Sequence, residues 1–401
     1  MPTLLIEYTD PLEGFKGWLV MDRLRYRLSA GGMRVQPGLT GEHLAAMARN
    51  MTRKMRLAEL AVDGAKCGID YDPASPGKGA AIGRFLGAIK PYITSRYSMG
   101  PDLNVEMSEL ERAAHSLGIP SVKMAVAQAQ GWDLPYFLER SRTLEEKVGD
   151  FTLGQLRAGY GVAAAALGTL ARLGIEPAQA RVAVQGFGTL GRAALFGLAE
   201  AGCRIVAIGD ARQTLTSKEG EGLPVEFLLK HPPPLLPPAA LLPGATSRPR
   251  AEIFNCPADL LIPAALENTV TPEIAASLQV KAVVPGANLA VPAASALILQ
   301  QRGIPVLPDF LVGCGGSLSM EGLYGPDAQP SARQVLDHVR DKMHRLVKEV
   351  LDQSRRDGCS PGDAALRIIA SRPALEERRP YELTEQTRPT KIEPNHAQPP
   401  L

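Results

Sequence analysis

The spacing of hydrophobic residues near the start of the chain predicts strands followed by a long helix. Short apolar runs at 4–8, 16–21 and 28–35 are typical of strands. From Thr40, a good helix-capping residue, the period changes to that of an amphipathic helix. The residues that recur at helical spacing are Leu44, Met47, Ala48 and Met51.

Glycine and proline separate the elements that follow. The stretch 63–69, DGAKCGI, reads as a glycine-rich turn around a lysine, Lys66. A helix is predicted at 75–93, and a strand or loop followed by a helix at 96–118. A long helix of small residues at 149–174 would connect this part to the second half.

In the second half, short apolar strands alternate with helices, which predicts a parallel sheet. Strands are predicted within 258–266, 280–288 and 304–312, each running into a proline or glycine turn. The proline-rich stretch 231–250 is incompatible with a regular helix or a central strand, so we expect a loop over the sheet. Residues 331–370 are predicted to be helical.

A glycine turn at the start of this second half predicts a dinucleotide site. The sequence GFGTLG lies between a predicted strand and a predicted helix, and contains Gly186, Gly188, Thr189, Leu190 and Gly191. Such glycines permit a tight turn and let a pyrophosphate approach the helix N-terminus. A second strand then ends at Asp210, whose carboxylate can accept hydrogen bonds from the adenosine ribose. This acid favours NAD over NADP, although Arg212 lies two residues further on.

Composition excludes several classes of partner. The 401 residues are 45% hydrophobic and 21% charged, and the net charge of +2 gives no reason to expect nucleic acid. No uncharged apolar stretch is long enough for a membrane span, and the N-terminus lacks the order of a signal peptide. The five cysteines are scattered without metal-binding spacing, so we expect no metal, no disulfide framework and a cytoplasmic location.

Two lysines, Lys54 and Lys66, stand in stretches that are otherwise apolar or rich in small residues. Burying an ammonium group is costly unless the group is paired or its pKa falls. Two such cations 12 positions apart are therefore a first indication of a chemical site.

Several motifs in order resemble the glutamate/leucine/phenylalanine/valine dehydrogenases. The first half carries GGMR, MTRK, GAKCGI with a following DP, and SRYSMGPDLNVEMSEL. The second half carries VAVQGFGTLG, NCPADLLIPAALEN, VVPGAN and PDFLVGCGGSLS. The resemblance covers roughly residues 15–370 and is strongest to the leucine/phenylalanine/valine branch.

The resemblance implies reversible oxidative deamination of an α-amino acid to a 2-oxo acid and ammonia. Lys54 would hold the substrate α-carboxylate, Lys66 would activate water, and Asp102 would move protons to and from the amine. Asn268 and Asn288 would contact the cofactor at its ribose and nicotinamide end. The other expected substrate-site positions are Gly32, Ala30 and Met320.

The resemblance also implies a two-domain α/β architecture. Residues 1–148 would form a substrate-binding and oligomerisation domain, with helices at about 331–375 packing back onto it. Residues 149–330 would form a Rossmann-type, doubly wound NAD-binding domain, and 376–401 a poorly ordered tail. We expect a homo-oligomer, with a hetero-oligomer containing a paralogue as the alternative.

Some positions depart from the family pattern. Ala30 replaces the lysine that binds the glutamate side chain, and Met320 stands where a serine assists it, which favours an apolar or non-standard substrate. Other departures are Ala158, Asn104, Asp63, Cys67, Arg56 and Arg157. Asp63 could pair with a lysine, and Arg56 could replace the missing one. These changes keep open a second hypothesis, a weakly active regulatory paralogue that binds nucleotide or amino acid.

Overall fold

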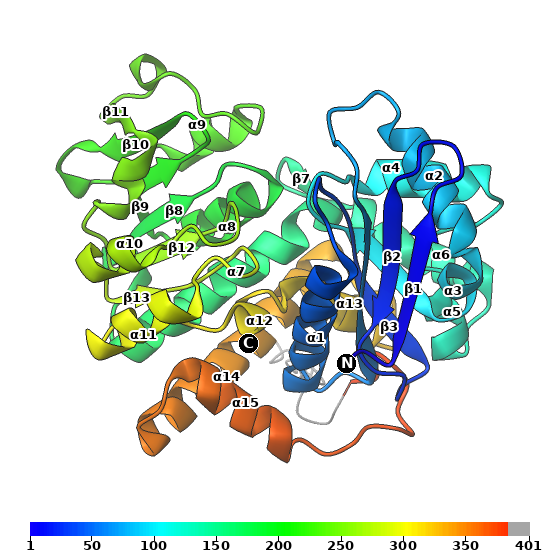
Figure 1. Cartoon of the computed structure of the whole chain (residues 1–401). Coiled ribbons are helices and arrows are strands. Elements are labelled where there is room, and N and C mark those ends of the chain that lie inside the picture. Colours follow the sequence, from blue (N-terminus) through cyan, green and yellow to red (C-terminus); the bar gives the residue numbers. More distant parts are fainter. Residues whose placement is uncertain (384–401) are drawn as a thin grey trace, which may run out of the picture.

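The computed structural model describes residues 1–383, which form two α/β lobes joined by long helices (Figure 1). The front lobe holds a mixed sheet of strands in the order β1-β2-β4-β3-β5. Its strands are β1 (Leu4–Thr9), β2 (Lys16–Met21), β3 (Leu28–Val35), β4 (Val62–Ile69) and β5 (Tyr97–Pro101). Strand β3 runs parallel to both β4 and β5, so the carboxyl ends of these three strands meet at one edge.

Helices cover both faces of the front sheet. They are α1 (Gly41–Leu57), α2 (Lys78–Ala88), α3 (Lys90–Ser95), α4 (Met107–Ser116), α5 (Ala125–Gln130) and α6 (Leu134–Ser141). As predicted, Thr40 caps α1 and accepts a hydrogen bond from the His43 N–H. The single helix predicted at 75–93 is instead two helices, because α2 ends at Ala88 and a new helix with Pro91 in its first turn begins at Lys90.

The largest correction concerns residues 63–69, which form most of β4 rather than a turn. Every residue of this strand is buried between β2 and β3. Small side chains are required there because a Cβ on Gly64 would lie 2.1 Å from the Thr52 nitrogen of α1. The glycines therefore allow α1 to approach the sheet closely, and Lys66 is held in a strand.

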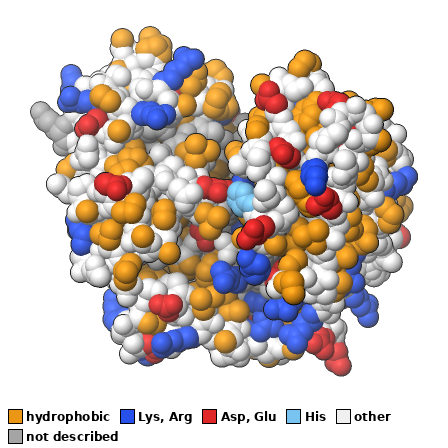
Figure 2. Space-filling view, viewed as in Figure 1, with side chains coloured by type: hydrophobic (Ala, Val, Ile, Leu, Met, Phe, Trp, Pro, Cys, Tyr) orange, Lys and Arg blue, Asp and Glu red, His pale blue; other side chains and the backbone are white. Residues whose placement is uncertain are grey.

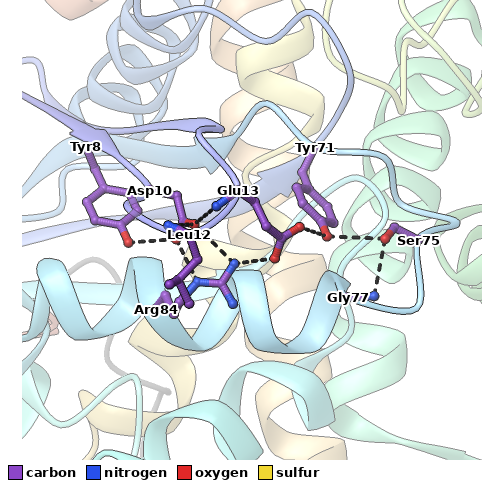
Figure 3. A network of polar contacts seen from close by, with 8 residues as sticks. All are labelled: Tyr8, Asp10, Leu12, Glu13, Tyr71, Ser75, Gly77 and Arg84. Carbon is purple, nitrogen blue, oxygen red and sulfur yellow. Dashed lines mark hydrogen bonds and ion pairs between the residues drawn. The ribbon is translucent and has the colours of Figure 1, made fainter.

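A polar network fastens the turn between β1 and β2 to α2 (Figure 3). Asp10 accepts hydrogen bonds from the Leu12 and Glu13 amides, the Tyr8 hydroxyl and Arg84. Hydrogen bonds from Arg84, together with those from the amides and the hydroxyl, outweigh burial and hold the pKa of Asp10 below its usual range.

The second lobe has the expected doubly wound core. Its sheet has the order β11-β10-β9-β8-β12-β13, and β9, β8, β12 and β13 are parallel. The strands are β8 (Arg181–Gln185), β9 (Arg204–Gly209), β10 (Gln213–Ser217), β11 (Ala245–Pro249), β12 (Leu260–Pro263) and β13 (Ala282–Val283). The two-domain α/β fold class predicted from the sequence is confirmed.

The helices of this half are α7 (Leu153–Leu173), α8 (Thr189–Glu200), α9 (Val225–Lys230), α10 (Pro272–Ser277), α11 (Ala293–Gln301), α12 (Asp309–Val312), α13 (Gly315–Tyr324), α14 (Ala332–Asp357) and α15 (Pro361–Ser371). A small two-stranded ladder, β6 (Lys147–Val148) and β7 (Phe151–Thr152), precedes α7. The connector α7 starts at a capping box made by Thr152 and Gln155 and ends at Gly174 in the left-handed conformation. Its small residues let α8 approach, because a Cβ on Gly159 would lie 2.2 Å from the Leu190 carbonyl oxygen.

Three sequence predictions in this half were wrong in part. Residues 304–312 are no strand: Val306 makes one isolated bridge and α12 follows. The end of the proline-rich stretch is an edge strand, β11, paired antiparallel with β10. The expected tail is packed at its start, where Tyr381 is buried against Tyr324, while 384–401 lie outside the described residues.

No helix between residues 1 and 383 is both long enough and apolar enough to cross a bilayer. The described part of the chain also contains no group of three or more acidic, histidine or cysteine side chains arranged to hold a metal ion.

Candidate functional site

Lys66 and Asp102 meet at the carboxyl edge of the front sheet. Lys66 projects from β4, Asp102 follows β5, and the Lys66 Nζ lies 3.1 Å from the Asp102 Oδ2. Gly32 of β3 lies between them, since a Cβ there would be 3.0 Å from the Asp102 Cβ and 3.5 Å from the Lys66 Nζ. Strand pairing therefore assembles a cation, a carboxylate and a glycine gap that the sequence separates.

Asp102 is ionised because two cations surround it. Burial alone would raise the pKa of Asp102, but the charges of Lys66 and Arg34 outweigh burial and hold the pKa below its usual range. Both cations contact the same carboxylate oxygen, Oδ2. The described chain offers no hydrogen-bond donor to the other oxygen, Oδ1, so Oδ1 can accept a proton from a bound amine.

Lys54 supplies a second buried ammonium group at the same place. It projects from the last turn of α1, is 9% exposed and forms no ion pair with any residue of 1–383. Burial lowers its pKa, and the neighbouring charge of Lys66 adds to this effect. Gly313 makes room for it, because a Cβ at that position would lie 2.8 Å from the Lys54 Nζ. An unpaired buried ammonium is a suitable partner for a carboxylate.

Lys54 and Lys66 line a small cavity between the two lobes. The front lobe contributes Met47, Asn50 and Met51, and the second lobe contributes Asn288, Leu289 and Phe310. The cavity volume is only about 10 Å³. This is room for about one water molecule, so the described arrangement leaves no space for an amino acid beside the two lysines.

The other two predicted substrate residues are apolar and buried. Ala30 of β3 is 9% exposed and Met320 of α13 is 6% exposed, and both belong to the core that spans the lobes. Met55 of α1 belongs to it as well. Neither Ala30 nor Met320 carries a charge that could take the place of the family lysine.

Two concerns raised by the sequence have a structural answer. Asp63 does not pair with a lysine: its Oδ2 accepts a hydrogen bond from the Tyr26 amide and faces Arg96 at 4.0 Å. Arg56 donates to the carbonyl oxygens of Ile369 and Arg372, so it fastens the C-terminal helix α15 to α1. The structure therefore supports neither of the two possibilities, that Asp63 pairs with a lysine or that Arg56 takes the place of the missing one.

Asn104 is compatible with the position of a family glycine. It adopts φ 61°, a left-handed conformation that asparagine tolerates better than most residues. Its side-chain amide donates to the Val35 carbonyl oxygen at 3.0 Å and so fixes the loop that carries Asp102.

The glycine turn has the geometry of a phosphate cradle. Gly186 adopts φ 115° and packs against Ala264, and a Cβ on Gly191 would lie 2.0 Å from the Gly186 oxygen. Gly188 instead faces open space, because a Cβ on this residue would have no neighbouring atom within 4 Å. Helix α8 begins at the next residue, Thr189, with Leu190 in its first turn. These residues fit a pyrophosphate at the helix N-terminus.

The carboxylate of Asp210 already accepts hydrogen bonds from backbone amides of the protein, which the sequence did not reveal. Its Oδ1 accepts hydrogen bonds from the Arg212 and Gln213 amides. Its Oδ2 accepts one at 2.6 Å from the amide of Leu236, which belongs to the proline-rich stretch. A ribose hydroxyl would therefore share Asp210 with this loop.

The two predicted asparagines lie on adjoining loops of the second lobe. Asn268 adopts φ 55°, and its backbone N–H donates to the carbonyl oxygen of Leu289, the residue after Asn288. Glu267, the residue before Asn268, contacts Arg34 of the front lobe. The loops that carry Asn268 and Asn288 thus face the Lys54–Lys66–Asp102 cluster.

Lys123 is a charged residue of this region that sequence reasoning missed. It is 4% exposed, and its Nζ donates to the Met99 carbonyl oxygen of β5 at 3.2 Å. Burial, together with the charge of Arg157, lowers its pKa to about 7. No local motif marks Lys123, because its burial depends on the packing of elements that are distant in the sequence.

Comparison with known proteins agrees with this geometry. The family model for the Glu/Leu/Phe/Val dehydrogenase dimerisation domain matches residues 5–117, and that for Glutamate/Leucine/Phenylalanine/Valine dehydrogenase matches residues 154–376. The chain is 29% identical to the glutamate dehydrogenase of Thermotoga maritima over 344 residues, covering 84% of this chain and 78% of that protein. It is 30% identical to the Aeropyrum pernix glutamate dehydrogenase over 314 residues, covering 75% and 70%.

Solved structures show the same fold. The hetero-hexameric glutamate dehydrogenase from Thermus thermophilus, in a leucine-bound form, superposes with a TM-score of 0.72 at 25% identity, covering 94% of this chain and 89% of that one. The L-tryptophan dehydrogenase of Nostoc punctiforme shares the fold at 17% identity, with a TM-score of 0.61 and coverage of 94% and 97%. The chain belongs to the glutamate/leucine/phenylalanine/valine dehydrogenase family and is an NAD(P)-dependent amino-acid dehydrogenase.

Proposed function

We propose that this protein catalyses the NAD-dependent, reversible oxidative deamination of an L-α-amino acid with an apolar or non-standard side chain. The products are a 2-oxo acid and ammonia. The observation that carries the proposal is the contact of Lys66 with Asp102 beside the unpaired Lys54, all facing the cofactor loops.

Each residue of this cluster has a distinct task in the proposed reaction. The Lys54 ammonium binds the substrate α-carboxylate, which would otherwise be buried without a counter-ion. Oδ1 of Asp102 accepts a proton from the substrate ammonium group, so that the nitrogen lone pair can form the imine as the Cα–H bond breaks. NAD, when bound, supplies the acceptor for the hydride that leaves Cα.

Lys66 then serves the hydrolysis of the imine. Lys66 first gives a proton to solvent. As the amine it then takes a proton from water, and the resulting hydroxide attacks the imine carbon. Asp102 returns its proton to the nitrogen, the C–N bond breaks to release ammonia, and the Asp102 carboxylate takes the hydroxyl proton as the carbonyl forms, while the Lys66 ammonium stabilises the carbonyl oxygen. The short distance between Lys66 and Asp102 lets the pair exchange protons without bulk solvent.

The apolar side-chain preference is supported by Ala30 and Met320. Both lie in a hydrophobic cluster, and neither offers a charge to a distal carboxylate. Arg56, the nearest sequence candidate for that charge, is bound to the carbonyl oxygens of Ile369 and Arg372. The NAD preference is supported by Asp210, whose carboxylate would repel a 2′-phosphate.

The direct test is NADH formation by the purified chain across a panel of aliphatic, aromatic and acidic L-amino acids. Turnover of at least one apolar amino acid, absent in Lys66→Ala, is the expected result. Turnover restricted to glutamate would contradict the substrate assignment.

A second candidate function is that of a regulatory subunit in a hetero-oligomer. It is supported by Ala158, which offers no hydroxyl where the family has a threonine, and by the Leu236 amide on Asp210. The Thermus thermophilus relative is hetero-hexameric and was solved with leucine. No turnover of any amino acid alone, together with a changed rate of a co-assembled glutamate-type relative, would favour this second function.

A further inference from the structure

Arg34 links the proposed proton-transfer residue to the opposite lobe. It lies near the end of β3, and its side chain is 5% exposed. Its Nε donates to the Asp102 Oδ2 at 2.7 Å, and its Nη1 donates to the Glu267 Oε1 at 2.5 Å. Nη1 also donates to the Gln36 Oε1 at 3.1 Å. One guanidinium group therefore contacts a carboxylate of each lobe.

The position of Glu267 depends on the loops expected to bind the cofactor. Glu267 directly precedes Asn268, whose backbone N–H donates to the carbonyl oxygen of Leu289, in the loop that also contains Asn288. Its second oxygen, Oε2, lies 3.4 Å from the His43 Nε2 of α1. In the space-filling view, a histidine flanked by acidic side chains lies at the junction of the lobes (Figure 2).

This contact is more than an exposed surface ion pair. Exposed pairs contribute little because water and salt screen them. Here the Arg34 side chain is almost completely buried and the Glu267 side chain is 25% exposed. The planar guanidinium fork also fixes direction as well as distance, which a single ammonium group does not do.

The contact depends on how far apart the two lobes lie. The cavity beside Lys54 and Lys66 holds only about 10 Å³, so the described arrangement has no room for an amino acid to enter unless the lobes move. Because Arg34 and Glu267 stand on opposite lobes, separation pulls them apart. Closure re-forms the contact and returns Arg34 to one orientation beside Asp102.

We infer that Arg34 and Glu267 are positioning residues that align Asp102 for proton transfer only when the lobes are closed. Glu267 holds the guanidinium group so that Arg34 and Lys66 together occupy Oδ2, which leaves Oδ1 for the substrate amine. The inference rests on the proposed role of Asp102.

The test uses Glu267→Gln and Arg34→Lys in the full-length protein. Glutamine keeps the size of Glu267 but removes its charge, and lysine keeps the charge of Arg34 but cannot contact both carboxylates. Glu200→Gln is the matched control, since Glu200 forms an ion pair with Arg333 away from the cleft. Loss of a charge-assisted hydrogen bond predicts that each test variant lowers kcat/KM by about 10- to 100-fold. The control should stay within about twofold of the unmodified protein.

A pH profile separates positioning from a simple charge effect. In Glu267→Gln both cations beside Asp102 remain, so the acid limb of kcat/KM should stay in place or move to lower pH. Movement of this limb to higher pH, or unchanged kcat/KM in both test variants, would overturn the inference.

Hydrogen exchange tests the same contact without turnover, and so separates failure of this inference from failure of the proposed function. The amides of Asp102 and Asn268, both hydrogen-bonded in the closed form, should exchange faster in Glu267→Gln than in Glu200→Gln. Equal exchange at both amides would overturn the inference even if the unmodified protein deaminates amino acids.

Discussion

At the residue scale, the proposed chemistry depends on buried charges, some of which are paired with an opposite charge and one of which is not. Asp102 is compensated twice, by Lys66 and Arg34, whereas Lys54 has no carboxylate partner among residues 1–383. Uncompensated burial is unfavourable for an ammonium group in the free protein. A substrate carboxylate would compensate this charge, so we expect Lys54 to favour binding of the anionic end of an amino acid.

Lys66→Ala should lower kcat by about 10²- to 10⁴-fold, the range typical of losing a central acid–base group. NADH affinity should hardly change, because the glycine turn at 186–191 lies in the other lobe. Steady-state kinetics and fluorescence titration with NADH measure the two quantities. Lys16→Ala, which removes an exposed lysine paired with Glu7, is the matched control. Near-full activity of Lys66→Ala would assign water activation to another residue.

Lys54→Met should act mainly on substrate binding. Loss of the α-carboxylate partner predicts a KM for the amino acid raised by about tenfold or more, because a charged hydrogen bond is lost. Stability should not fall, since methionine removes an unpaired buried charge from a similar volume. Thermal unfolding and kinetics on the same preparation measure both. A lower Tm with unchanged KM would show that Lys54 is structural.

Residues of the site that stand in local motifs could be predicted from the sequence, whereas contacts between residues far apart in the sequence could not. Lys54, Lys66 and Asp102 each stand in a local motif, so the sequence identified them individually. Arg34 and Glu267 are 233 residues apart, and no local pattern reveals that they meet. Lys123 was missed for the same reason, because its burial is created by packing between distant elements.

At the element scale, strand β4 shows why a glycine-rich sequence need not be a turn. Its small residues suggested a loop, but they serve the close packing of α1 on the sheet. The reverse happened at 304–312, where an apolar stretch reads as a strand but forms one bridge and a short helix. In both cases tertiary packing outweighed local propensity.

The network around Asp10 should stabilise the front lobe in a pH-dependent way (Figure 3). Because the folded-state pKa of Asp10 is depressed, its contribution is present above the unfolded-state pKa of about 4 and is lost as pH falls through the lower folded value. Asp10→Asn should therefore lower Tm at pH 7, and the difference from the unmodified protein should shrink in acid. A Tm difference that grows as the pH falls would contradict this network.

We expect Asp210, together with the proline-rich stretch at 231–250, to determine the cofactor preference. The unmodified protein should use NAD better than NADP, and Asp210→Ser should narrow the gap because the charge facing a 2′-phosphate is removed. The ratio of kcat/KM for the two cofactors is the measurement. Equal ratios before and after the substitution would mean that Asp210 serves only to hold the Leu236 amide.

At the scale of the whole molecule, the two lobes enclose a site that neither could form alone. Lys54, Lys66 and Asp102 come from the front lobe, while Asn288 and Phe310 come from the second. The described arrangement is closed, with the cavity reduced to the size of a water molecule. We therefore expect turnover to involve opening and closing of the lobes, which the C-terminal helices α14 and α15 connect (Figure 1).

We expect the part of the site that faces the substrate side chain to decide which amino acid is deaminated. Neither Ala30 nor Met320 offers a charge to a glutamate side chain, and a carboxylate buried there unpaired would cost several kcal/mol. A branched aliphatic or aromatic side chain would instead gain about 1.5–3 kcal/mol from burial.

The most direct test is the ratio of kcat/KM for leucine, valine or phenylalanine to kcat/KM for glutamate, measured with NAD. An apolar pocket predicts a ratio of at least about a hundredfold for the best apolar substrate. It also predicts that Ala30→Lys combined with Met320→Ser lowers this ratio. Glutamate as the best substrate of the unmodified protein would contradict the apolar pocket.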